Sequence, residues 1–158
     1  LALGALYKEY ELDAKVLAKA EVRLHTPQPR VALGLALRGI AHSALDVSDG
    51  LIGDLGHILK KSGVGATLHV DALPAGPMLQ KQTQDMRRRF TLAGGDDYEL
   101  CFTAPVSKRE TVLGAALAAD TVVTRIGSID AASGLRLLDQ AGRPLDLNIT
   151  SFDHFASP

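Results

Sequence analysis

Apolar residues recur at helical or strand spacing along most of the chain. In residues 1–24 the apolar positions are three and four residues apart with charges between them, which predicts a helix. Two prolines in residues 25–30 then end it, because each removes a backbone donor and fixes φ. A second apolar helix is predicted over residues 31–40, a strand over residues 43–47, and an amphipathic helix over residues 50–61.

The second half of the chain alternates shorter strands and helices. Apolar and β-branched content predicts strands over residues 66–70, 97–104 and 121–129. Helices are predicted over residues 78–89 and 107–118, and a hairpin-like pair, residues 135–138 and 144–147, surrounds Gly142. Because strands and helices alternate imperfectly, we expect an α+β fold in which a mixed β-sheet is flanked by helices.

Composition narrows the class of protein. A chain of 158 residues is long enough for one domain with a core of its own. Its 17 basic and 18 acidic residues leave neither sign in excess, which argues against a nucleic-acid surface or an anionic membrane as partner. The single cysteine, Cys101, excludes an internal disulfide. With no signal peptide and no apolar run of about eighteen residues, we expect a cytoplasmic protein.

The segment ALDVSDGLIGDL, residues 44–55, places acids where the predicted strand runs into a helix. Asp46 and Ser48 are two residues apart and share a face if the segment is extended, whereas Asp49 is placed to cap the helix. Carboxylates grouped with a hydroxyl are the oxygen ligands that Mg²⁺ takes, and a helix start with Gly50 offers N–H groups to a phosphate. The alternative is an N-cap preceded by a solvated acid, which leaves Asp46, between apolar neighbours, unexplained.

A second group of acids precedes the strand predicted over residues 97–104. Gly94 and Gly95 are followed by Asp96 and Asp97. Glycines let the backbone turn with positive φ, and acids at the end of a strand can reach a ligand held above the edge of a sheet. The alternative is a tight turn with solvated aspartates.

Three short motifs occur at these positions and near the end of the chain: DVSDGL at residues 46–51, GGDDYEL at residues 94–100 and FDHF at residues 152–155. Together they closely resemble the C-terminal half of the thiamine-monophosphate kinase family. That family uses ATP and Mg²⁺ to convert thiamine phosphate to thiamine diphosphate. DVSDGL alone is similar to the wider superfamily that includes aminoimidazole-ribotide synthetase and selenophosphate synthetase, and the other two motifs narrow the resemblance.

The resemblance implies a role for each matching residue. Asp46 matches a ligand of one Mg²⁺, Asp49 a ligand of another, and Ser48 a contact to ATP. Asp96 stands where the family commonly has a glutamate that holds the thiamine substrate, so its reach is about 1.5 Å shorter. Phe152 matches an aromatic residue that packs against the substrate, a role suited to a ring facing a cationic thiazolium.

The resemblance also implies how the chain is organised. We expect residues 1–26 to lead in from an N-terminal ATP-binding domain and residues 27–158 to form the C-terminal kinase domain. The start at Leu1, inside a predicted helix, indicates a part of a longer protein, which we expect to be a homodimer. This part alone is expected to be inactive. The alternatives are another ATP-dependent enzyme of the superfamily, or a non-catalytic module that binds nucleotide or thiamine phosphate.

Overall fold

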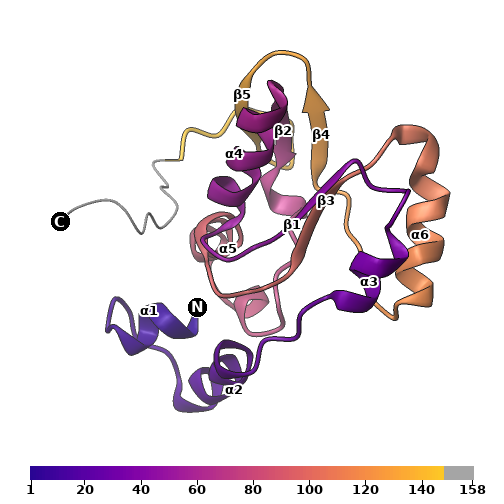
Figure 1. The fold of residues 1–158 in the computed structure, drawn as a ribbon. Helices are drawn as coiled ribbons and strands as arrows, with labels where there is room; N and C mark the ends of the chain where they lie inside the picture. Colours follow the sequence, from indigo (N-terminus) through magenta and orange to yellow (C-terminus); the bar gives the residue numbers. More distant parts are fainter. Residues whose placement is uncertain (148–158) are drawn as a thin grey trace.

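The computed structural model describes residues 1–147 (Figure 1). Its helices are α1 (Ala2–Leu6), α2 (Ala14–His25), α3 (Val31–Ala36), α4 (Leu51–Ser62), α5 (Gln84–Ala93) and α6 (Arg109–Ala118). The strands are β1 (Ser43–Asp46), β2 (Gly65–His69), β3 (Leu100–Thr103), β4 (Gly127–Asp130) and β5 (Gly134–Leu138). Three single 3₁₀ turns lie between them: η1 (Val70–Ala72), η2 (Leu79–Lys81) and η3 (Val106–Lys108). No helix in this part of the chain has both the length and the apolar character needed to cross a membrane.

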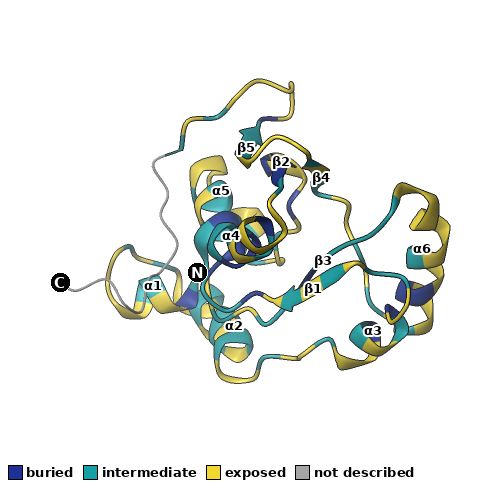
Figure 2. Ribbon diagram, turned by 45° about the horizontal axis from the view of Figure 1, so that its top comes forward, coloured by how far each residue is buried: buried dark blue, intermediate teal, exposed yellow. Residues whose placement is uncertain are grey.

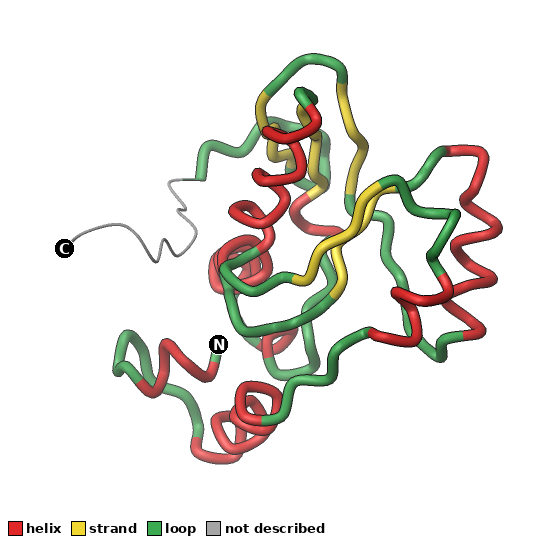
Figure 3. The backbone as a smooth tube through the Cα atoms, viewed as in Figure 1, coloured by secondary structure: helices red, strands yellow, loops and turns green. Residues whose placement is uncertain are grey.

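The described strands form two sheets. The three-stranded sheet has the order β4-β2-β5, with β2 antiparallel to β4 and parallel to β5. The other sheet is the antiparallel pair of β1 and β3, which runs through the middle of the molecule (Figure 3). Helices α4 and α5 lie on one side of this pair, and α3 and α6 lie on the other (Figure 1). The expected α+β architecture with a mixed sheet and flanking helices is therefore confirmed, although its strands are divided between two sheets.

The apolar core has two parts. The larger part joins the buried face of α4 to β2 and α5, and Leu92 at its centre is 0% exposed. The smaller part lies between α3 and α6 around Leu33, Leu37 and Ala115. In Figure 2 the ribbon is coloured as buried along part of α4 and where α3 and α6 face each other. Because β1 and β3 lie between the two parts, the loops at the ends of these strands are held from both sides.

Several predicted elements differ from the observed ones at their ends. The helix predicted over residues 1–24 is two helices, and α2 begins at Ala14 because the Asp13 side chain caps it by accepting the Lys15 N–H (2.9 Å). The helix predicted over residues 78–89 is instead η2 followed by α5, with Thr83 as its cap.

The strands observed near the end of the described chain also differ from the predicted ones. The strand predicted over residues 121–129 is confined to β4, whose residues 127–130 are the ones in register with β2. The hairpin-like pair around Gly142 is present as a turn in which the Leu145 N–H donates to the Leu137 carbonyl (2.8 Å). β5 itself pairs with β2.

Asp71 in η1 ties three separate segments together. Its carboxylate accepts two hydrogen bonds from the Arg88 guanidinium (2.9 and 2.8 Å) and one from the Gln140 N–H (3.0 Å). The bonds from Arg88, more than those from Gln140 and Gln84, lower the pKa of Asp71 from 3.8 to about 2. Because this pKa is depressed in the folded state, the pair stabilises the fold above about pH 4, and the stabilisation disappears as pH falls through about 2.

We therefore expect Asp71→Asn to lower the free energy of unfolding at pH 7 by about 1 kcal/mol, a value reduced by solvent screening at the surface. Urea unfolding at pH 7 and at pH 3 measures the change, and the difference from wild type should shrink at pH 3. Asp85→Asn, an exposed acid on the first turn of α5, is the control and should change stability by less than about 0.5 kcal/mol. A difference for Asp71→Asn that stays constant with pH would contradict the linkage.

Candidate active site

The two acid-bearing motifs meet where β1 ends and β3 begins. In the antiparallel pair, Asp46 lies opposite Leu100, so the segment after β1 continues alongside the segment before β3. The Val47 N–H donates to the Glu99 carbonyl (2.8 Å), and the Tyr98 N–H donates to the Val47 carbonyl (2.9 Å). Backbone pairing therefore extends beyond the strands and holds together two motifs that are about fifty residues apart in sequence.

One further hydrogen bond joins the turns themselves. The Asp96 N–H donates to the Ser48 carbonyl (2.9 Å). Gly95 lies so close to this carbonyl that a Cβ atom at position 95 would be 2.4 Å from its oxygen. At Gly94, a Cβ atom would be 2.4 Å from the Phe90 carbonyl oxygen. The two glycines are therefore required for close approach of backbone to backbone.

The positive φ angles lie at other residues than Gly94 and Gly95, which corrects the expectation that these glycines turn the chain. Asp96 has φ of 60° and Tyr98 has φ of 51°, so two non-glycine residues adopt the left-handed conformation beside the site. Gly50, with φ of 110°, occupies a region that only glycine enters readily. Each of the two motifs therefore contains left-handed or otherwise unusual backbone, as functional sites often do.

The prediction that Asp49 caps helix α4 is wrong. The N-cap residue is Gly50, and its φ of 110° directs the chain into the helix without a side-chain cap. Instead Asp54, on the first turn of α4, reaches back and accepts the N–H groups of Ser48 (2.9 Å) and Asp49 (3.1 Å) on one oxygen, Oδ2. The cap position of α4 is therefore one residue after Asp49, at a residue that has no side chain.

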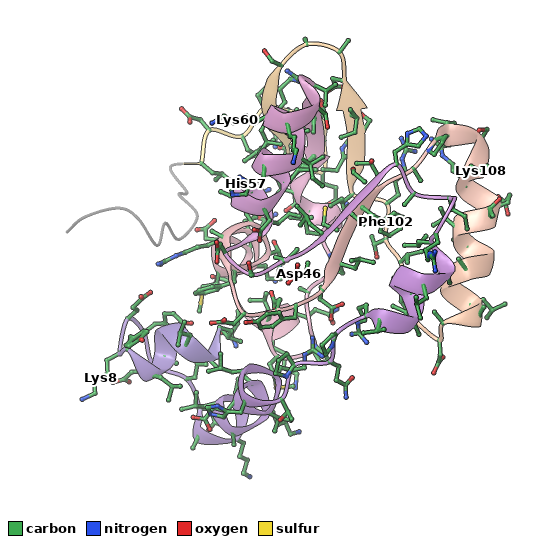
Figure 4. The ribbon with its side chains drawn as sticks, in the orientation of Figure 1. Lys8, Asp46, His57, Lys60, Phe102 and Lys108 are labelled. Atoms are coloured by element: carbon green, nitrogen blue, oxygen red, sulfur yellow. The ribbon has the colours of Figure 1, made fainter. Side chains whose placement is uncertain are left out.

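The side chains that sequence motifs nominate differ in exposure. Asp46, labelled at the end of β1 in Figure 4, is exposed, whereas Ser48, Asp49 and Asp96 are half-buried. Asp46 is the last residue of β1, Ser48 and Asp49 lie in the turn that follows it, and the backbone bond to Ser48 brings Asp96 beside that turn. Phe152 lies outside the described residues, so its position stays a prediction.

The donor set of this turn fits a magnesium ion that is shared with a phosphate. Two carboxylates and a hydroxyl are hard oxygen donors, and Mg²⁺ in proteins is commonly held by one or two carboxylates together with substrate phosphates and water. Within residues 1–147, no group of three or more His, Cys, Asp or Glu side chains is gathered as a metal site. An ion at Asp46 or an ion at Asp49 would therefore need further oxygen ligands from a bound phosphate, from water or from another part of the protein.

Two arginines that sequence reasoning missed bind Glu99, near the C-terminal end of the motif GGDDYEL. The Glu99 carboxylate accepts a two-pronged contact from Arg30 (Nε–Oε2 2.8 Å, Nη2–Oε1 2.7 Å) and a further bond from Arg23 in α2 (Nη2–Oε1 2.8 Å). Hydrogen bonding to Arg30 in particular holds the pKa of Glu99 below its usual range. The sequence signal was the place of Arg30 at the end of the segment PQPR, residues 27–30, whose two prolines restrict the path of the backbone.

Comparisons with known proteins agree on one family. The family model described as AIR synthase related protein, C-terminal domain, matches residues 3–140. The curated thiamine-monophosphate kinase of Salmonella typhimurium is 43% identical over 94% of this chain and 45% of its own length. The one from Escherichia coli K12 is 41% identical over 92% of this chain and 44% of its own.

A solved structure gives the same result. The crystal structure of thiamine-monophosphate kinase from Stenotrophomonas maltophilia K279a superposes with a TM-score of 0.78 and is 40% identical, covering 86% of this chain and 45% of that one. The chain thus spans a little under half the length of the relatives that it matches.

Proposed function

This chain belongs to the AIR synthase related protein family, whose C-terminal domain it carries, and from this premise we propose that it is the C-terminal part of a thiamine-monophosphate kinase. The parent protein would transfer the terminal phosphoryl group of ATP to thiamine monophosphate. Relatives of that name, over 40% identical along nearly the whole chain, support the proposal. The observation that carries it is the 2.9 Å hydrogen bond between Asp96 and Ser48, because it joins the motif proposed for the substrate to the motif proposed for the nucleotide.

The site residues have distinct proposed roles. Asp46 and Asp49 hold Mg²⁺, Ser48 contacts ATP, Asp96 contacts thiamine monophosphate, and Phe152 packs against its thiazolium ring. Phosphoryl transfer depends mainly on placing donor and acceptor in line and on neutralising charge, so two short loops fixed against each other suit it. A bound Mg²⁺ would supply the charge neutralisation, while the loops themselves hold the reactants in place.

The remaining features of the parent are proposed from the same family membership. Residues 1–26 lead in from an N-terminal ATP-binding domain, which would supply the further metal ligands that Asp46 and Asp49 need. Residues 27–158 form the kinase domain. The parent is proposed to act as a homodimer in the cytoplasm, with neither nucleic acid nor membrane as partner.

The test is a coupled assay of ADP release by the full-length parent protein. We expect release that requires both Mg²⁺ and thiamine monophosphate, with thiamine diphosphate as the second product. Omitting thiamine monophosphate, or replacing it with thiamine, is the control and should leave only background release. ADP release with a different small molecule would move the assignment to another ATP-dependent enzyme of the superfamily. Binding of nucleotide or thiamine monophosphate without any ADP release would identify a non-catalytic module.

A further inference from the structure

Asp54 is a buried acid to which the proposed function assigns no ligand. It is 6% exposed and lies on the first turn of α4, among the leucines of the larger core. Burying a carboxylate is costly unless it is hydrogen-bonded. Here the bonds go to the main-chain N–H groups of Ser48 and Asp49, which carry the proposed ATP and metal contacts.

These bonds extend into a chain that crosses the whole site. Asp54 Oδ2 accepts the Asp49 N–H (3.1 Å), and the carbonyl of the same peptide group, that of Ser48, accepts the Asp96 N–H (2.9 Å). The Asp54 carboxylate thus sets the direction of the turn after β1. Through the Ser48 carbonyl, this turn holds the loop that bears Asp96. Charged acceptors form shorter and stronger bonds than neutral ones, and bonds in series polarise one another.

We propose that Asp54 is a positioning residue that fixes the nucleotide loop (residues 46–50) against the substrate loop (residues 94–98). This inference rests on the proposed function, which assigns one loop to the nucleotide and the other to the substrate. The hydrogen bonds that join the loops do not depend on that assignment. Asp54 is not among the residues proposed to contact either reactant. It acts through the peptide groups of Ser48 and Asp49, so its loss would leave the ligand side chains present but misplaced.

The same chemistry elsewhere in the chain provides a matched control. Asp139 is 7% exposed, and its Oδ1 accepts the N–H groups of Ala141 and Arg143 (both 2.8 Å) in the turn after β5. It is therefore also a buried aspartate that bridges two main-chain amides. These amides belong to the turn after β5 and to neither motif. Asp139 also accepts a hydrogen bond from the Arg143 side chain (2.8 Å), so its loss gives an upper limit for the structural cost of removing such a bridge.

The first measurement is steady-state kinetics of the full-length protein carrying Asp54→Ala, Asp54→Asn or Asp139→Ala. We expect Asp54→Ala to lower kcat about thirtyfold, in the range seen when an outer positioning partner is lost. Asp54→Asn keeps one oxygen to accept both N–H groups and should lower kcat only about fivefold. Asp139→Ala should keep kcat per folded molecule within about twofold while lowering the melting temperature.

The second measurement is hydrogen exchange of the substrate-free protein, read on peptides that cover the nucleotide loop and the substrate loop. Asp54→Ala should exchange about tenfold faster in both loops, since the lost bonds are worth about 1.4 kcal/mol. Asp139→Ala should leave both loops protected. If Asp54→Ala does not fold, Asp54→Asn decides by the same two measurements.

The outcomes separate this inference from the proposed function. Wild-type kcat and wild-type protection of the substrate loop in the Asp54 variants would overturn the positioning role. No turnover of thiamine monophosphate by the unmodified protein would overturn the proposed function alone, because the exchange measurement still shows whether Asp54 holds the two loops together.

Discussion

Asp46→Asn in the full-length parent should lower kcat about a thousandfold and shift the melting temperature by no more than about 3 °C. The amide has nearly the shape of the carboxylate, and Asp46 is exposed at the end of β1, so folding loses little. A magnesium ion held there loses a charged ligand, and with it the stabilisation of the charge that builds up during phosphoryl transfer. Coupled kinetics and thermal unfolding of the same samples measure both effects.

The matched control for Asp46→Asn is Asp85→Asn, which removes an exposed acid from α5 and should leave kcat unchanged. Raising the Mg²⁺ concentration should partly restore Asp46→Asn, because weaker binding of the ion contributes to the loss. A variant with normal kcat at limiting Mg²⁺ would show that Asp46 is no metal ligand.

Gly95→Ala should lower kcat/KM about a hundredfold and destabilise the fold by about 2 kcal/mol. Its Cβ would stand 2.4 Å from the Ser48 carbonyl oxygen, which is a main-chain atom and cannot rotate away. The two loops must therefore separate, which lengthens or breaks the bond from the Asp96 N–H. Misplacing reacting groups by about 1 Å is enough for a loss of this size.

Gly56→Ala in α4 is the control for Gly95→Ala, since nothing lies within 4 Å of a Cβ atom placed there. It should keep kcat/KM and stabilise the helix by about 0.5–1 kcal/mol. Kinetics and urea unfolding compare the pair. Equal behaviour of the two variants would show that the contact at Gly95 does not set the spacing of the loops.

Local signals were sufficient to predict the elements that carry the site. Helix α4 was predicted within one residue at each end, because its apolar stripe is regular and Gly63 ends it with φ of 65°. The motifs likewise identified the turn after β1 and the loop before β3. The helix and the two motif segments are determined by residues close together in the sequence, so the sequence pattern alone predicts them.

The features that the sequence did not reveal depend on distant contacts. Nothing in the pattern showed that β1 pairs with β3, since pairing over some fifty residues is decided by the packing of both strands. The capping role given to Asp49 failed because the helix begins one residue later, with Gly50 as its N-cap, and Asp54 accepts the Asp49 N–H from inside the helix. One signal was present: Asp54 lies three residues after Leu51, which puts an acid on the buried face of the predicted helix.

At Asp96 the residue that would give the more stable fold differs from the residue proposed to bind the substrate. With φ of 60°, a non-glycine residue there carries a conformational cost of about 1 kcal/mol, which glycine would avoid. Directed evolution that screens only for heat resistance would therefore favour glycine at position 96 and discard the acid proposed to hold the substrate. A library of variants of this chain that is screened for stability should keep Asp96 constant and place its substitutions in the helices.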